Sequence, residues 1–224
     1  MSAYVANRGT SQSVSFGTTL SLTPSGAMGA GNKGILFIGY LESYVSVTGV
    51  SGGGVTWTER SDTSGNGGLA IYEASGACST AGITITLGTA SSAGVCCSLE
   101  EFSGMGTYDK GATHTGGFGA DWDSGTTGTS AQANQMAVAA CTNQDDTAFN
   151  ANPTGYTPMT QVVITGNMAM KCWYKVRSSV GTEIAQTTGS GGFVGGAGHS
   201  YEAAVQLFND STGLTKTGLG IVGP

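Results

Sequence analysis

Two stretches of the sequence carry the same order of features about one hundred residues apart. The first begins at Gly34 with an apolar segment, continues through a glycine-rich turn and further strand-like segments, and closes near Phe102; the second runs from Gln135 to Phe208. Segments such as GITITL alternate apolar and polar residues with a period of two, which is the period of a β-strand with one buried face. The repeat predicts two related halves, 34–104 and 135–210, of four to five strands each.

Neither half can bury its apolar face alone, whereas two halves packed together can. The sequence therefore predicts an all-β fold, a jelly-roll-like antiparallel β-sandwich with about eight core strands. Composition agrees, because 39 of the 224 residues are glycine, only 10% are charged, and Thr, Ser and Val are abundant. A further strand is expected between Val14 and Leu22, where the alternation continues up to the break at Pro24.

One sandwich domain is expected over 13–210, flanked by an N-terminal arm, 1–12, and a C-terminal tail, 211–224. Both ends are polar and irregular, so we expect them to be disordered when free and to add to a neighbour's sheet edge on assembly. The connection 103–130 is long for a structureless loop inside a compact domain. It is expected either to contain an added strand or to extend away and contact a partner.

Four aromatic residues in irregular segments are candidates for interaction. Their rings either fill the core of the chain itself or anchor in a partner's pocket, as aromatic residues often do at interfaces. A third reading is that the tyrosines beside loop glycines stack against a sugar. The interaction candidates are Tyr108, Phe118, Trp122 and Tyr156.

The five cysteines show no C-x-x-C pair and no histidine at zinc-ligand spacing. They are either small buried apolar residues or, at Cys96 and Cys97, partners in an intermolecular disulfide formed in an oxidising medium. The segment Asp121–Gly125 resembles the start of a calcium loop, but the twelfth position holds Gln132 instead of glutamate. We therefore expect no metal and no cofactor.

The segment Gly49–Gly53 fits the G-x-S-x-G pattern of a hydrolase nucleophile elbow, which requires a following helix. A strand pattern follows instead, so the serine is expected in a hairpin. No pattern marks a serine as the partner of His114 or His199. The adjacent acids Glu100 and Glu101 point to opposite faces of a strand and cannot flank one sugar ring. The sequence therefore predicts a protein that is not an enzyme.

The net charge is −6, with only 8 Lys and Arg residues. Phosphate binding depends on clustered Lys and Arg, so nucleic acid is not expected as a partner. No basic segment followed by an apolar run stands at the N-terminus, and no apolar stretch approaches the roughly 20 residues that cross a bilayer. A soluble product made in a cytoplasm is expected, with no signal peptide, transmembrane segment or membrane partner.

The segments GTTLSLTPSG, GILFIGYL, VTGVSGGGVTWT, LAIYEA and LEEFSG resemble the glycine- and threonine-rich β-sandwich proteins found among tailed-bacteriophage virion components and related bacterial surface modules. The resemblance spans Thr18 to Phe208, and its motifs are structural, with no catalytic residues. It implies a virion protein assembled in the host cytoplasm, either a capsid decoration (cement) protein or a tail or fibre component. The implied partners are the major capsid protein or another virion protein, and further copies in a homo-oligomer. The alternative is a carbohydrate-binding adhesion module that grips a host glycan.

Overall fold

The structure is a computed structural model that describes residues 1–14, 17–41, 45–64, 67–91, 93–116, 121–144, 149, 151–187 and 200–211. Within these ranges the chain forms antiparallel strands and no helix. The strands are β1 (Ala3–Ser13), β2 (Gly17–Leu22), β3 (Lys33–Leu41), β4 (Val47–Gly52), β5 (Trp57–Ser64), β6 (Gly67–Ala74), β7 (Ile83–Ser91), β8 (Val95–Ser103), β9 (Met105–Gly116), β10 (Asn134–Asn143), β11 (Thr157–Ile164), β12 (Met168–Ser178) and β13 (Tyr201–Asp210).

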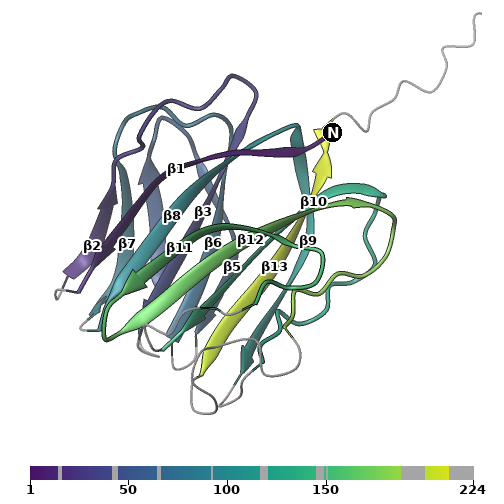
Figure 1. Ribbon diagram of the computed structural model, residues 1–224. Helices are drawn as coiled ribbons and strands as arrows, with labels where there is room; N and C mark the ends of the chain where they lie inside the picture. Colours follow the sequence, from purple (N-terminus) through teal and green to yellow (C-terminus); the bar gives the residue numbers. More distant parts are fainter. Residues whose placement is uncertain are drawn as a thin grey trace, which may run out of the picture.

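The strands form three sheets that pack face to face (Figure 1). A central sheet has the order β1-β8-β3-β6-β5, a small sheet has β2-β7-β4, and a C-terminal sheet has β11-β12-β10-β13-β9. One face of the central sheet packs on the small sheet and the other on the C-terminal sheet. The predicted all-β antiparallel sandwich is confirmed. The expected number of about eight core strands is too small. Strands β1 to β8 by themselves already form two packed sheets, the central sheet and the small sheet.

Strand β3 shows why the central sheet is buried on both faces. Its sequence, GILFIGYL, is an apolar run without polar alternation, which is the pattern of a doubly covered strand. Leu36 and Ile38 pack against the small sheet, whereas Ile35 and Phe37 pack against the C-terminal sheet, and all four side chains are fully buried. Strands β8 and β10 have the same unbroken burial.

The outer face of the C-terminal sheet is covered by extended segments instead of a regular sheet. Segments 121–130 and 181–187 run antiparallel, with backbone hydrogen bonds from Thr187 N to Trp122 O and from Ser130 N to Gly181 O, both 3.0 Å long. They enclose a third apolar core. Between these two segments the β-bridge that forms is an isolated one, which joins Asp123 and Gln186.

The central and C-terminal sheets have the same strand order in the two parts of the chain. Strands β1, β8, β3, β6 and β5 correspond in order to β9, β13, β10, β12 and β11. The contacts between the sheets are reciprocal, because β1 packs beside β11 while their counterparts β9 and β5 pack together at the opposite edge. Such reciprocity is what an approximate two-fold axis between two similar units produces. The two units also include β1 and β9, which lie outside the predicted halves 34–104 and 135–210, so those halves stay a prediction.

Two aromatic pairs occupy corresponding places in this arrangement. The rings of Tyr4 and Phe102 meet edge to face with centroids 5.6 Å apart, and those of Tyr108 and Phe208 do so at the same distance. Each pair joins the edge strand of a five-stranded sheet to its neighbour: β1 to β8 in the central sheet, and β9 to β13 in the C-terminal sheet. The match between Phe102 and Phe208, which the sequence suggested, therefore coincides with equivalent packing.

Outside the repeats, one expectation is wrong, and one of two alternatives is met. The segment 1–12 is not a disordered arm, because residues from Ala3 onward form β1 and pair with β8. The connection 103–130 contains the added strand β9, which pairs with β13. Both strands supply edges to five-stranded sheets that would otherwise expose β8 and β13. Of the predicted tail, 211–224, only Ser211 lies among the described residues.

The triple glycine after β4 makes a turn between two sheets. Gly52, Gly53 and Gly54 have φ angles of 93°, 70° and 72°, a left-handed conformation that other residues adopt only with strain. Because β4 belongs to the small sheet and β5 to the central sheet, the two strands do not form the expected hairpin. No helix follows Ser51, so the nucleophile-elbow geometry is absent from this described segment.

Gly68 offers a test of the packing in the central sheet. It lies opposite Tyr40 on the neighbouring strand, and a Cβ atom at Gly68 would come within 1.9 Å of the Tyr40 ring. We expect Gly68→Ala to lower the free energy of unfolding by about 1–3 kcal/mol through overpacking. The control is Gly49→Ala in β4, where a Cβ would meet nothing within 4 Å. Equal urea midpoints for the two variants would contradict the described contact.

Candidate functional site

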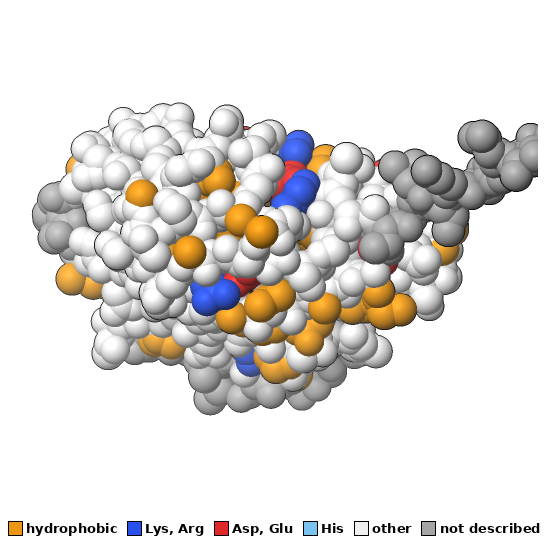
Figure 2. Space-filling view, turned by 90° about the horizontal axis from the view of Figure 1, so that it is seen from above, with side chains coloured by type: hydrophobic (Ala, Val, Ile, Leu, Met, Phe, Trp, Pro, Cys, Tyr) orange, Lys and Arg blue, Asp and Glu red, His pale blue; other side chains and the backbone are white. Residues whose placement is uncertain are grey.

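Several hollows lie at one end of the stack of sheets. We call it the end face: it is formed by the starts of β1, β3, β9 and β10 and the ends of β12 and β13. Three hollows open on it, and neighbouring hollows share lining residues. Figure 2 looks down on the molecule from above and shows hydrophobic side chains gathered beside mixed clusters of positive and negative ones.

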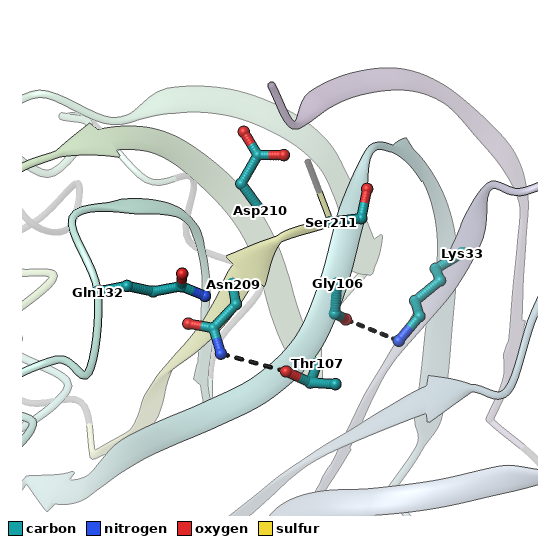
Figure 3. Close-up of a pocket in the computed structure, with 7 residues that line it drawn as sticks. All are labelled: Lys33, Gly106, Thr107, Gln132, Asn209, Asp210 and Ser211. Carbon is teal, nitrogen blue, oxygen red and sulfur yellow. Dashed lines mark hydrogen bonds between the residues drawn. The ribbon is translucent and has the colours of Figure 1, made fainter. Parts of the chain in front are cut away.

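The largest of these three hollows has a volume of about 500 Å³ and is lined by polar residues that turn mostly apolar atoms toward it (Figure 3). Lys33 Nζ donates to the carbonyl oxygen of Gly106 at 2.7 Å, and Asn209 Nδ2 donates to Thr107 Oγ1 at 3.2 Å. These bonds hold the start of β9 between β3 and β13. The lining residues are Lys33, Gly106, Thr107, Gln132, Asn209, Asp210 and Ser211.

Two smaller hollows continue this surface across the C-terminal sheet. One, of about 200 Å³, shares Asp210 with the largest hollow. The other, of about 310 Å³, lies along residues 175–183 and shares Val176 and Arg177 with the second hollow. The end face is therefore one continuous uneven surface. Exposed aliphatic side chains accompany it, with Val176 at 46% and Val180 at 55% exposure.

Two clusters of charged side chains lie at the end face, one in each half. Glu73 accepts from Lys33 and from Arg60, whose NH2 atom lies 2.5 Å from the Glu73 carboxylate. Glu183 accepts from Lys175 at 2.7 Å and from Arg177 at 2.8 Å. In each cluster two cations share one buried carboxylate.

The edges of the sheets are shaped against pairing with another chain. In both five-stranded sheets the register shifts fall at β1, β5, β9 and β11, the edge strands, while the described interior pairs are regular. The extra residue lies in the edge strand each time. Bulges of this kind twist an edge away from a neighbour and suppress edge-to-edge association. Contacts with a partner are therefore expected through side chains at the end face instead of through sheet extension.

The aromatic interaction candidates are largely used by the chain itself. Trp122 is 1% exposed and packs on Trp173, with ring centroids 5.0 Å apart, and Tyr156 is 6% exposed in the same core. Tyr108 is partly buried between Phe208 and the guanidinium of Arg60, which lies 4.5 Å from the ring centroid. For Trp122 and Tyr156 the structure therefore shows the first of the expected alternatives, a ring that fills the core of the chain itself. Phe118 lies outside the described residues.

Of the two alternatives for the cysteines, small buried apolar residues or an intermolecular disulfide at Cys96 and Cys97, the structure shows the first. Both residues have 0% exposure, and all five cysteines are free and buried. Burial raises the pKa of Cys97 to about 12 and that of Cys78 to about 11, so the reactive thiolate is scarce at neutral pH. All five thiols therefore lie inside the stack, and none is at the surface of the molecule.

Thiol labelling should follow this burial. We expect the native protein to react with none of its five thiols on the minute scale in Ellman's reagent at pH 8, and to react with all five after unfolding in guanidinium. The absence of a disulfide-linked dimer on a non-reducing gel is expected for the same reason. One fast native thiol equivalent would show that a cysteine is accessible and would contradict the structure.

The remaining titratable cluster lies at the opposite end, around His114. Its Nδ1 atom is 2.9 Å from Asp123 Oδ1, and the Tyr201 hydroxyl lies 3.4 Å from the same nitrogen. Burial raises the pKa of the nearby Glu202 carboxyl. Hydrogen bonds from two threonines stabilise the ionised carboxylate and oppose part of this rise. In the described residues no serine or cysteine bonds to His114, so no nucleophile accompanies the Asp–His pair. His199 lies outside those residues.

The calcium-like segment has a structural explanation. The Asp123 carboxylate accepts from the backbone N–H of Gly125 at 2.8 Å, which closes a tight turn, and Gly125 has a φ of 69°. Across the described ranges, no group of three or more His, Cys, Asp and Glu side chains is placed to hold a metal ion.

Sequence reasoning did not find the end face. Its residues are distributed over six strands and carry no common motif, although Lys33 and Asp210 do stand at the ends of apolar runs, where strands emerge from the core. No protein-family model, curated protein or solved structure matches the chain. The part of the chain that is described contains no helix of the length and apolar character that a membrane span requires.

Proposed function

We propose that the chain is a structural protein of a virus particle, a capsid decoration protein of the tailed-bacteriophage kind, that binds the shell through protein–protein contacts. The observation that carries this proposal is the end face, where joined hollows, exposed aliphatic side chains and charged clusters lie together. Protein interfaces combine these elements, with an apolar centre and a polar rim. The virion setting rests on the sequence resemblance.

The rest of the molecule suits a structural role. Three stacked sheets enclose two continuous apolar cores, and covering segments enclose a third. Buried carboxylates are hydrogen-bonded: Glu101, for example, is bound by Arg8, by Asn32 and by the backbone N–H of Gly29. Bulged edges limit uncontrolled association before assembly. A decoration protein needs this combination of a resistant fold and one defined contact surface.

The test is quantitative peptide mass spectrometry of purified extracellular particles from the source culture. The copy number of this chain is compared with that of the most abundant shell protein. We expect a ratio near a simple fraction, as for a protein that decorates a symmetric lattice. A few copies per particle would indicate a tail or fibre component, and complete absence would overturn the virion role.

A second candidate is a carbohydrate-binding adhesion module, and the polar groups at the rim of the largest of the three hollows are the observation that favours it. Lys33, Thr107 and Gln132 present an ammonium, a hydroxyl and an amide to a space of about 500 Å³, a size that suits a small polar ligand. On a glycan array this reading requires a signal that Gln132→Ala removes. An array that stays blank with the labelled wild-type protein would reject it.

A further inference from the structure

The described strands form their ladders within two consecutive parts of the chain. The first unit, 1–103, contains β1 to β8, and the second unit, 105–211, contains β9 to β13. The central and small sheets belong wholly to the first unit, and the C-terminal sheet belongs wholly to the second. No ladder between described strands joins one unit to the other. The two units therefore contact each other without sharing a sheet.

The covers on the outer faces follow the same plan in both units. In the first unit β2 precedes β3 and pairs with β7, which lies between β6 and β8 in the chain. In the second unit the segment 121–130 precedes β10 and hydrogen-bonds to 181–187, which lies between β12 and β13. Each unit thus encloses an apolar core of its own under a cover. It meets the other unit through the remaining face of its five-stranded sheet.

The core between the central and C-terminal sheets is therefore an interface between the two units. Phe37 and Phe102 of the first unit and Val138 and Phe208 of the second are fully buried in it. Obligate interfaces between subunits have this apolar character and resemble a domain core cut in half. Units that separated would expose both apolar faces to water, so each face would need another copy of its partner unit.

Gly104 is the single residue between β8 and β9, and so between the two units. Its φ is 65°, and a Cβ atom there would lie 2.7 Å from the carbonyl oxygen of Met1. Its own carbonyl oxygen accepts from the Ser2 hydroxyl and from Ser211 N, both at 2.8 Å. Short connections under such constraint favour the exchange of whole units between copies of a chain.

We propose that two copies of this chain exchange units, so that the first unit of each packs on the second unit of the other, with Gly104 as the hinge. The same apolar faces meet in the monomer and in this dimer, and every strand ladder is kept. The two forms differ at the hinge, so the conformation of Gly104 and the protein concentration decide between them. Exchange of this kind does not depend on the proposed virion role.

The first experiment changes the hinge. Wild type, Gly104→Ala and Gly31→Ala are unfolded in guanidinium, refolded at several protein concentrations and analysed by size-exclusion chromatography with light scattering. We expect a wild-type dimer fraction that rises with concentration, and an association constant about tenfold or more higher for Gly104→Ala. Alanine resists a left-handed φ and would press on Met1, which destabilises the closed monomer more than the open hinge.

Gly31→Ala is the control for backbone strain. Gly31 has a φ of 81°, a Cβ there would meet nothing within 4 Å, and the residue lies between β2 and β3 of the same unit. Its strain is the same in monomer and dimer, so we expect the dimer fraction of wild type.

A longer connection tests the hinge in the opposite direction. Inserting Gly-Ser-Gly after Gly104 lets the units of one chain meet without a constrained residue, so we expect less dimer than in wild type. This variant keeps the test decisive if Gly104→Ala does not fold. Equal dimer fractions for wild type and the insertion variant would overturn Gly104 as the hinge.

The second experiment identifies which units meet in the dimer. Tyr4 of the first unit and Tyr174 of the second stack with ring centroids 5.2 Å apart. A Tyr4→Cys chain and a Tyr174→Cys chain are unfolded and refolded together, and the dimer fraction is treated with a short bis-maleimide. An exchanged dimer with one chain of each kind brings the two introduced thiols together, so we expect a cross-linked product of two chains.

The control is a mixture of the same two variants after each has been refolded alone, which should give no cross-link between chains. A dimer that gives no such product in the co-refolded sample associates through its outer surface and would overturn the exchange. A chain that stays monomeric at every concentration would overturn it as well. Both experiments use the purified chain alone, so their outcomes are separate from particle binding.

Discussion

Replacing Trp173 by alanine is expected to lower the free energy of unfolding by about 3–5 kcal/mol, the usual cost of deleting a large buried aromatic side chain. Trp173 is fully buried on the outer face of the C-terminal sheet. Its ring packs against Trp122 and against Phe149, and its Nε1 donates to Asn152 Oδ1 at 2.9 Å. The substitution therefore removes the centre of the third core, and we expect the covering segments to become susceptible to proteolysis before the sheets unfold.

The matched control is Trp57→Ala at the start of β5. Trp57 is only partly buried, and its Nε1 donates to the Gly52 carbonyl at 3.1 Å. We expect a loss of about 1–2 kcal/mol there, because less apolar surface is removed from the core. Urea unfolding followed by far-UV circular dichroism measures both variants. If Trp173→Ala lowered the free energy of unfolding as little as Trp57→Ala does, the third core would contribute little to stability.

Replacing Glu101 by glutamine is expected to cost about 3 kcal/mol at pH 7, because it leaves the guanidinium of Arg8 without its buried partner. The Glu101 side chain has 0% exposure, and its carboxylate also accepts from Gly29 N at 2.7 Å. Burial by itself raises the pKa of this carboxyl, but the hydrogen bonds from Asn32 and Gly29 and the charge of Arg8 outweigh it, so the pKa lies below its usual value.

The effect of Glu101 depends on pH in a defined direction. A carboxyl whose pKa is lower in the folded state than in the unfolded state stabilises the fold above the unfolded pKa, near 4.3 for glutamate. That contribution disappears as the pH falls through the folded pKa. We therefore expect the difference in unfolding free energy between wild type and Glu101→Gln to be largest at pH 6–7 and to shrink below pH 4. A difference that grows toward low pH would contradict the assigned contacts.

The control for this charge is Glu59→Gln. Glu59 is exposed and accepts one hydrogen bond, from the Tyr72 hydroxyl at 2.9 Å. Removing the charge of an exposed carboxylate changes stability little, so we expect a loss below about 1 kcal/mol at pH 7. The two variants together separate the effect of a buried ion pair from that of lowering the net negative charge.

The sequence predicted local structure well where the signal lies within a few residues. The alternation in GITITL placed β7, and the run GILFIGYL placed β3, because a strand's period of two is visible in any short segment. The glycines at 52–54 predicted a turn for a stereochemical reason that needs no tertiary information. The N-terminal residues were misjudged because their polar sequence suits an edge strand as well as a disordered arm, and only pairing with β8 distinguishes the two.

The residues of the candidate site could not be predicted from short segments of the sequence. Lys33 and Asp210 are 177 positions apart in the sequence, yet they line the same hollow. Trp122 is an equally clear case, since an aromatic residue in a glycine-rich connection can anchor a partner or fill a core. Its burial against Trp173 follows from the packing of the covering segments on the C-terminal sheet. No local pattern encodes that contact.

By itself, the sequence determined that this chain is an all-β antiparallel protein with repeated strand segments, because backbone geometry and the hydrophobic effect impose their periods on short stretches. Only the tertiary structure decided that the strands stack in three sheets, that the cysteines are sealed between them, and that one end gathers Lys33, Val180 and Asp210 into a single surface. The reason is physical. A doubly buried apolar strand is compatible with several partners, and the free energy that selects one of them comes from packing between residues far apart in the chain.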